Sequence, residues 1–133
     1  MSDPVREFLR NRGCPQHIIS GGLEGLIRAW EKTVESVERG YELGLYDYLN
    51  DLDGRQLIEE TLAIDGAANV QKYEERVRHA DERMRKQVSR TSHCLWGNAA
   101  ATEHQWSAEK HWWYFSEPKT AGRELLSDLK SRQ

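Results

Sequence analysis

The fold is decided by the stretch of residues 19–52, which reads ISGGLEGLIRAWEKTVESVERGYELGLYDYLNDL. Its apolar side chains recur every three or four residues, at Ile19, Leu23, Ile27, Trp30, Val34, Val37, Tyr41, Leu45, Tyr48 and Leu52. This spacing places them on one face of an α-helix, whereas a half-buried strand would need an apolar residue at every second position. The stretch therefore predicts a long amphipathic helix with one buried face.

Two glycines one helical turn apart, Gly40 and Gly44, interrupt this stretch. Inside a helix each glycine costs about 1 kcal/mol relative to alanine. One interpretation is a kink, or a break between two helices. The other is a flat face that another helix approaches closely. Both interpretations remain open from the sequence alone.

A second amphipathic pattern covers residues 70–88, with apolar side chains at Val70, Tyr73, Val77, Ala80, Met84 and Val88. Between the two patterns, Asp53-Gly54-Arg55-Gln56 has the spacing of a capping box, which predicts that a short helix begins there. Two long helices joined through a short one are expected to pack as an antiparallel pair. We therefore expect an all-α fold, a small helical bundle built on that pair, as a single domain over residues 1–133.

Shorter elements are expected at both ends of the chain. Asp3 followed by Pro4 is typical of a helix start, and Gly13 ends that first helix. Residues 120–130 are predicted to form a last short helix. A further helix is expected over residues 102–115, because Thr102 begins another capping-box pattern, and an extended aromatic run over residues 112–115 is the alternative. This Trp-rich C-terminal segment is expected to pack against the helix pair.

The composition indicates a folded chain of the reducing cytoplasm. The mean hydropathy is -0.83 and charged residues make up 31%, but five Trp, five Tyr and two Phe argue against disorder. Cys14 and Cys94 form no CxxC pair and the polar start resembles no signal peptide, so a cytoplasmic location is expected. No apolar run approaches the ~20 residues that a membrane span needs.

Charge is distributed unevenly along the chain. Residues 1–66 hold 13 acidic and 7 basic side chains, whereas residues 67–133 hold 9 and 12, for a net charge of -3. The two halves are therefore expected to attract each other, within one molecule or between copies. The basic helix at residues 67–92 is an alternative nucleic-acid surface, but acidic residues interleave with its cations. The overall acidity argues against a general nucleic-acid binder.

Four of the five tryptophans, Trp96, Trp106, Trp112 and Trp113, lie close together in the sequence. One interpretation is a lid over the core. The other is an aromatic pocket with His104, His111, Glu103 and Glu109 at its rim, suited to a planar or cationic ligand or to a side chain of a partner. No catalytic set converges, so we expect a non-enzymatic protein-interaction or regulatory module. It would bind a protein partner or a second copy through these tryptophans or the glycine-flattened face.

The alternative function is a small metal- or ligand-binding enzyme whose pocket lies near His93, Cys94, His104 and His111. The spacing of these four side chains matches no zinc pattern. A calcium loop through Asp51, Asp53 and Glu60 would lack its first carboxylate, because Leu49 stands at that position. We therefore expect no metal and no cofactor.

Overall fold

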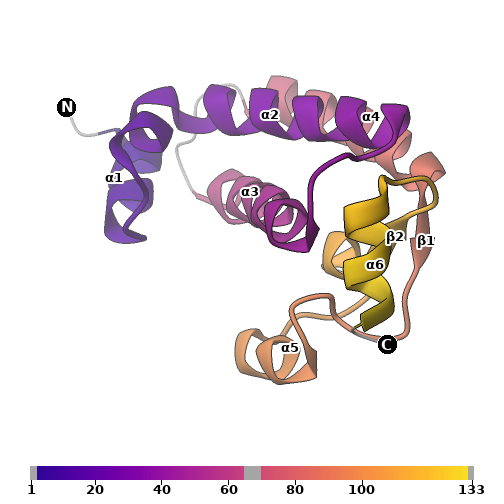
Figure 1. Cartoon of the computed structure of the whole chain (residues 1–133). Coiled ribbons are helices and arrows are strands. Elements are labelled where there is room, and N and C mark those ends of the chain that lie inside the picture. The colour runs from indigo at the N-terminus through magenta and orange to yellow at the C-terminus, as the bar shows by residue number, and fades with distance from the viewer. Residues whose placement is uncertain (1–2, 65–69, 132–133) are drawn as a thin grey trace.

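The computed structural model describes residues 3–64 and 70–131. The helices are α1 (Pro4–Asn11), α2 (Gln16–Arg39), α3 (Leu45–Leu62), α4 (Val70–Gln87), α5 (Asn98–His104) and α6 (Arg123–Ser131), with a 3-10 turn η1 (Trp112–Phe115) (Figure 1). Two short strands, β1 (Val88–Arg90) and β2 (Ser116–Pro118), pair antiparallel. The predicted fold class, a small all-α helical bundle, is confirmed.

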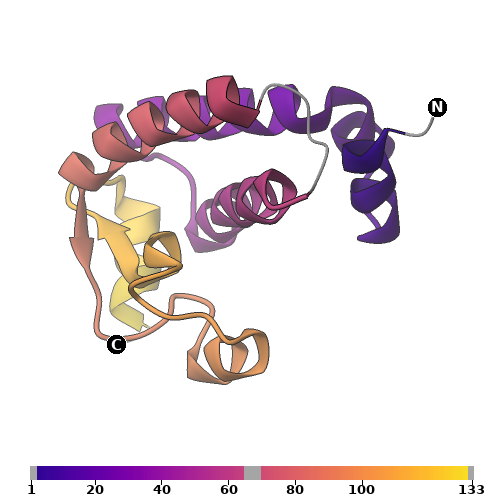
Figure 2. The same cartoon turned by 180° about the vertical axis from the view of Figure 1, so that it is seen from behind.

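The helix α2 is the centre of the bundle. Both α3 and α4 pack against it, and the two views show α4 alongside α2, with α3 below the two (Figures 1 and 2). The apolar face predicted for α2 is buried, including Leu23, Ile27, Trp30 and Val34. Burial of each such side chain contributes about 1.5–3 kcal/mol, so this face supplies much of the driving force for folding.

The prediction of one helix through residues 19–52 is wrong in its middle. The chain leaves α2 at Gly40, whose φ of +97° is rarely adopted by residues with a Cβ atom, and α3 begins at Leu45 and returns along α2. The interpretation as a break is therefore confirmed at Gly40. At Gly44, α6 lies nearby through side chains, because a Cβ atom there would lie 2.7 Å from Oε1 at the end of the flexible Glu124 side chain.

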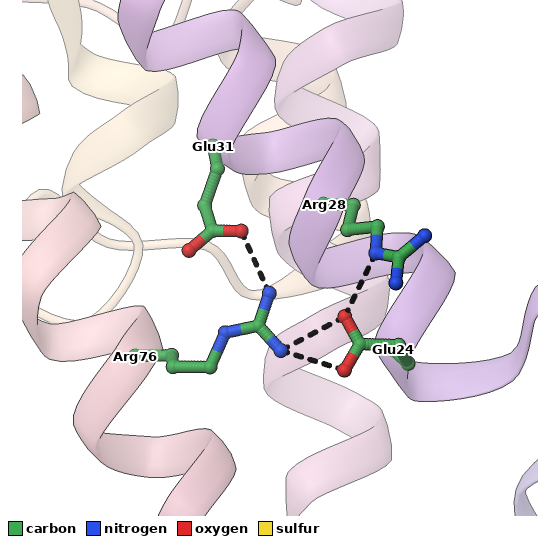
Figure 3. A network of polar contacts seen from close by, with 4 residues as sticks. All are labelled: Glu24, Arg28, Glu31 and Arg76. Atoms are coloured by element: carbon green, nitrogen blue, oxygen red, sulfur yellow. Dashed lines mark hydrogen bonds and ion pairs between the residues drawn. The ribbon is translucent and has the colours of Figure 1, made fainter.

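The helix α4 runs parallel to α2, and the antiparallel partner of α2 is α3. Arg76 of α4 donates to Glu24 and Glu31 of α2 at 2.7 Å, as Figure 3 shows, and Arg83 donates to Glu38 at 3.1 Å. Residue numbers thus rise together along both helices. The expected antiparallel packing of the two long amphipathic patterns is wrong. Because α3 runs back along α2, α4 begins near the start of α2 and runs in the same direction.

The ion pairs of Arg76 and Arg83 with carboxylates of α2 confirm the expected attraction between the acidic and basic halves of the chain.

A buried ion pair joins the three long helices. Arg55 in α3 is 5% exposed, and its guanidinium donates to both carboxylate oxygens of Asp81 in α4, at 3.0 and 2.8 Å. Trp30 of α2 donates its indole N–H to the same carboxylate at 2.9 Å. The ring of Trp113 covers the guanidinium, with 4.2 Å between the guanidinium carbon and the ring centroid. Asp81 therefore accepts two hydrogen bonds from α3 and one from α2.

The helix start predicted at Asp53 is wrong. Asp53 lies inside α3, eight residues after its first residue, Leu45. Because the helix continues through this position, Asp53 caps no helix start and the surrounding residues form no calcium-binding loop.

The chain after β1 differs from its predicted structure. The helix α5 ends at His104, where Gln105 adopts a left-handed conformation with φ +60°. The single 3-10 turn at Trp112–Phe115 is neither the predicted helix nor the extended alternative. Thr102 lies within α5 and donates to the carbonyl of Asn98 instead of capping a helix.

The two terminal helices are confirmed. The side chain of Asp3 accepts hydrogen bonds from the amides of Val5 and Arg6 at the start of α1, and α6 buries Leu125 and Leu129. None of the helices within residues 3–64 and 70–131 has the length and apolar character to cross a lipid bilayer.

The substitution Asp81→Ala is expected to lower the free energy of unfolding by about 3–5 kcal/mol, because it leaves the buried Arg55 guanidinium with only the half-exposed carboxylate of Glu59 as a counter-charge. Urea denaturation followed by circular dichroism measures the change. Glu82→Ala is the matched control, since it removes only an exposed contact with Arg78 and is expected to cost less than about 1 kcal/mol. Equal losses in the two variants would contradict the central role of Asp81.

The same glycine-to-alanine substitution is expected to change the free energy of unfolding in opposite directions at two positions. Gly25 lies inside α2 with open space around its missing Cβ atom, so Gly25→Ala is expected to stabilise the protein by about 0.5–1 kcal/mol. Gly40→Ala is expected to destabilise it by about 1–3 kcal/mol, because the backbone at Gly40 disfavours a Cβ atom. Thermal unfolding of both variants tests this, and a stabilised Gly40→Ala variant would contradict it.

Candidate functional site

A cleft of about 840 Å³ opens between three segments of the chain. One wall is the turn between α1 and α2, at residues 12–15. The second is a face of α3, and the third is formed by side chains between Trp96 and Tyr114. In Figure 1, α1 lies to the left of α3 and α5 lies below it.

The turn that forms the first wall is held by backbone hydrogen bonds. Gly13 adopts φ +76°, which allows the amide of Cys14 to donate back to the carbonyl of Leu9 at 3.1 Å and to close the end of α1. The thiol of Cys14, which is partly buried, lies in the wall of the cleft. Arg12, from the same turn, forms an ion pair with Glu60 of α3.

The wall that α3 contributes is a row of side chains spaced by three or four residues, Asp53, Gln56, Leu57 and Glu60. This spacing places them on one face of the helix. Asp53 accepts two hydrogen bonds on Oδ1, from the indole of Trp96 at 2.9 Å and from the hydroxyl of Tyr114 at 2.6 Å. Burial and the neighbouring carboxylate raise the pKa of Tyr114 above its ordinary range, so Tyr114 remains a neutral donor.

The segment 112–115 docks on α3 through two consecutive aromatic residues. Trp113 covers the Arg55 guanidinium, and Tyr114 donates to Asp53. Arg55 and Asp53 are two residues apart, so their side chains leave α3 in different directions. Both rings are buried, and the 3-10 turn directs Trp113 onto Arg55 and Tyr114 toward Asp53 at the inner wall of the cleft.

Three rings are stacked at the edge of the cleft. Trp106 lies between His104 and Tyr114, with ring centroids 4.6 and 4.0 Å away and both interplanar angles at 20°. Each such aromatic pair contributes about 0.5–1.5 kcal/mol beyond its burial. The stack holds the end of α5 and the following turn against Tyr114. Tyr114 is in turn held against α3 by its hydrogen bond to Asp53.

His111 is held as a neutral imidazole. Its Nδ1 atom accepts a hydrogen bond from the amide of Ser107 at 3.2 Å, and burial lowers the pKa of His111 below the ordinary value of 6.5. At pH 7 the proton of the ring is therefore on Nε2, so the side chain offers one N–H donor.

The structure brings together four of the residues singled out in the sequence. Trp96, Trp106, His104 and His111 all line the cleft. Glu103 is exposed on α5 and does not line it.

The other two candidate tryptophans have structural contacts elsewhere. Trp113 is 1% exposed and belongs to the core. Trp112 lies beneath the guanidinium of Arg85, 4.5 Å from guanidinium carbon to ring centroid, and lines a separate, smaller hollow.

The metal-competent residues do not converge. Cys94 is fully buried in the core, and this burial raises the pKa of its thiol, which disfavours the reactive thiolate. His93 does not line the cleft, unlike His104 and His111. Over the described residues, no three His, Cys, Asp or Glu side chains are arranged to hold a metal ion.

Several cleft residues were not recognised in the sequence, namely Arg12, Cys14, Asp53, Gln56 and Glu60. The last three share one helical face, which is a signal in the sequence, but a capping box explained Asp53 and Gln56 equally well. No local sequence pattern relates residues 12–15 to this face, because their contact depends on how α1 and α3 pack.

Comparison of the chain with protein-family models, with curated proteins and with solved structures found no match.

The stability of the protein is expected to depend on His111 in mildly acidic solution. Because the folded-state pKa of His111 is lowered, its contribution is fully present above pH 6.5 and is lost as the pH falls through the lowered value. In the variant His111→Asn, whose side-chain oxygen can replace Nδ1 as the acceptor, the free energy of unfolding should fall less between pH 7 and pH 5 than in the wild type. Urea denaturation at both pH values tests this, and identical falls would contradict the neutral state of His111.

Proposed function

We propose that this protein is a cytoplasmic, non-enzymatic interaction module that holds a segment of a partner protein in the cleft. The observation that carries the proposal is that the tryptophans lie in two different environments. Trp30 and Trp113 are sealed in the core, whereas Trp96 and Trp106 are only partly buried and line an open cleft. Partly buried indole rings in a cleft are typical of binding sites, where tryptophan supplies a large share of the binding energy.

The cleft has the size and the rigidity that binding requires. Its volume of about 840 Å³ falls within the range of ligand pockets. Asp53 holds the rings of Trp96 and Tyr114, and the stack of His104, Trp106 and Tyr114 holds a third ring. A segment that enters the cleft would find its aromatic walls already ordered, which lowers the entropic cost of binding.

The glycine-flattened face offers less room for a partner, because α6 covers it within the same chain. The amide of Gly122 donates to the carbonyl of Tyr41 at 2.6 Å, and Asp128 accepts from the amide of Leu45 at 3.1 Å. The cations Arg76 and Arg83 of the basic helix are paired with carboxylates of α2, which weakens the alternative of a nucleic-acid surface.

Of the four side chains of the enzymatic alternative, His93, Cys94, His104 and His111, only the two imidazoles of His104 and His111 line the cleft, and the thiol that shares it with them is that of Cys14. A nucleophilic thiol needs a base within hydrogen-bond distance. In the part of the chain that the structure describes, no side chain forms a hydrogen bond with the sulfur of Cys14. Binding is therefore better supported than catalysis.

The test selects peptides from a random displayed library on the immobilised protein and uses Cys14 as the reporter of cleft occupancy. Cys94 is fully buried, so a thiol reagent should modify Cys14 readily and Cys94 only after unfolding. A selected peptide is expected to slow the modification of Cys14 severalfold when it occupies the cleft.

A pair of matched variants localises the binding. Ala100 lines the cleft and Ala99, its neighbour on α5, is exposed outside it. Ala100→Trp, which fills the cleft, is expected to weaken binding of the selected peptides at least tenfold, whereas Ala99→Trp should leave it unchanged. Equal binding by both variants would overturn the proposal, as would a library that yields no binder. A dimer of the wild type that Ala100→Trp abolishes would replace the partner segment with a second copy of this chain.

A further inference from the structure

We infer that the segment held in the cleft is anchored by an arginine side chain whose guanidinium binds Asp53. This inference rests on the proposed function and names the chemistry of the partner that the cleft selects. It is supported by two hydrogen-bond acceptors of α3 that have no donor and by the aromatic ring beside them.

The two oxygens of the Asp53 carboxylate differ in their hydrogen bonds. Both of its hydrogen bonds, from Trp96 and Tyr114, fall on Oδ1, while Oδ2 has no partner within residues 3–64 and 70–131. Both donors are neutral, so the negative charge of Asp53 has no counter-charge beside it. A partly buried carboxylate of this kind is stabilised by a cation that reaches its second oxygen.

The other charged groups of the cleft do not supply that cation. Arg12 is engaged by Glu60, so these two charges neutralise each other. His111 is neutral at pH 7, because burial lowers its pKa. The carboxylate of Asp53 is therefore the unbalanced charge on the α3 wall, and the cleft favours a positively charged ligand over a neutral one of the same shape.

Gln56 adds a second acceptor on the same wall. It lies three residues after Asp53, on the same face of α3. Its Nε2 atom donates to Glu60 at 3.4 Å, but its carbonyl oxygen is buried and has no hydrogen-bond partner among the residues described. A buried acceptor without a donor costs about 1–3 kcal/mol. Because this oxygen is sealed from solvent, a donor of the ligand reaches it only after the Gln56 side chain rotates toward the cleft, whereas Oδ2 of Asp53 needs no such change.

The guanidinium of arginine fits these requirements better than an ammonium group. It is planar, remains charged at neutral pH, and carries five N–H donors in a fixed fork that can address two neighbouring acceptors. It also stacks favourably on aromatic rings, and the ring of Trp96 lies in the cleft wall, held by Asp53 itself. An ammonium group has three donors but no plane with which to stack.

The experiment compares three blocked tripeptides, acetyl-Gly-Xaa-Gly-amide, in which Xaa is arginine, lysine or citrulline. Citrulline has the shape of arginine without its charge. Binding is measured by the shift of the Trp96 indole resonance in NMR titrations. Arginine is expected to bind at least tenfold more tightly than citrulline and more tightly than lysine. Equal affinities for arginine and citrulline would overturn the inference, and stronger binding of lysine would overturn the choice of guanidinium.

The decisive variant is Asp53→Asn. The side-chain oxygen of asparagine can still accept from Trp96 and Tyr114, but the charge and the free acceptor are lost. The arginine peptide should then bind at least tenfold more weakly and the citrulline peptide should be unaffected. The control Asp47→Asn removes an exposed charge from the same helix and should change neither affinity more than twofold. Unchanged arginine affinity in a folded Asp53→Asn protein would contradict the inference.

Two further outcomes keep the inference separate from the proposed function. If library-selected peptides still protect Cys14 but show no preference for arginine over citrulline, the inference fails and the proposed function stands. If Asp53→Asn does not fold, Gln56→Met takes its place as the variant. Loss of its acceptor should weaken arginine binding at least threefold, and unchanged binding would overturn the role of this wall.

Discussion

The buried ion pair between Arg55 and Asp81 is the contact on which the rest of this structure depends. It joins α3 to α4, Trp30 of α2 donates to the same carboxylate, and Trp113 covers the guanidinium. A buried ion pair adds little net stability over a well-packed apolar pair, but removal of either partner leaves a charge that cannot be solvated. The constraint therefore acts mainly on geometry, since both charges are satisfied only when α3 and α4 bring Arg55 and Asp81 together.

The position of the cleft follows from that placement. The helix α3 presents Arg55 to the core and, two residues earlier, Asp53 to the cleft. Trp113 covers Arg55, and the next residue, Tyr114, donates to Asp53. The core and the candidate site are thus built by two adjacent pairs of contacts between α3 and η1. A change in the packing of Trp113 would move Tyr114, and with it the ring of Trp106 that stacks on Tyr114.

The candidate site was visible in the sequence only in part. The four side chains Trp96, Trp106, His104 and His111 could be singled out because aromatic and imidazole groups cluster in the C-terminal third. The wall opposite them could not. Asp53 bonds to residues 43 and 61 positions later in the chain, and its local pattern matched a helix cap that the start of α3 at Leu45 makes unnecessary.

The sequence by itself determined that the chain is helical over most of α1 to α4 and over α6, where the first helix begins, and which faces of α2 and α4 are apolar, because these properties depend on residues within one or two turns of each other. Only the tertiary structure decided that the chain reverses at Gly40, that α4 runs parallel to α2, and which tryptophans are buried. Each of these depends on contacts between segments far apart in the chain. The free energy of such contacts comes from shape and charge matching that no local pattern contains.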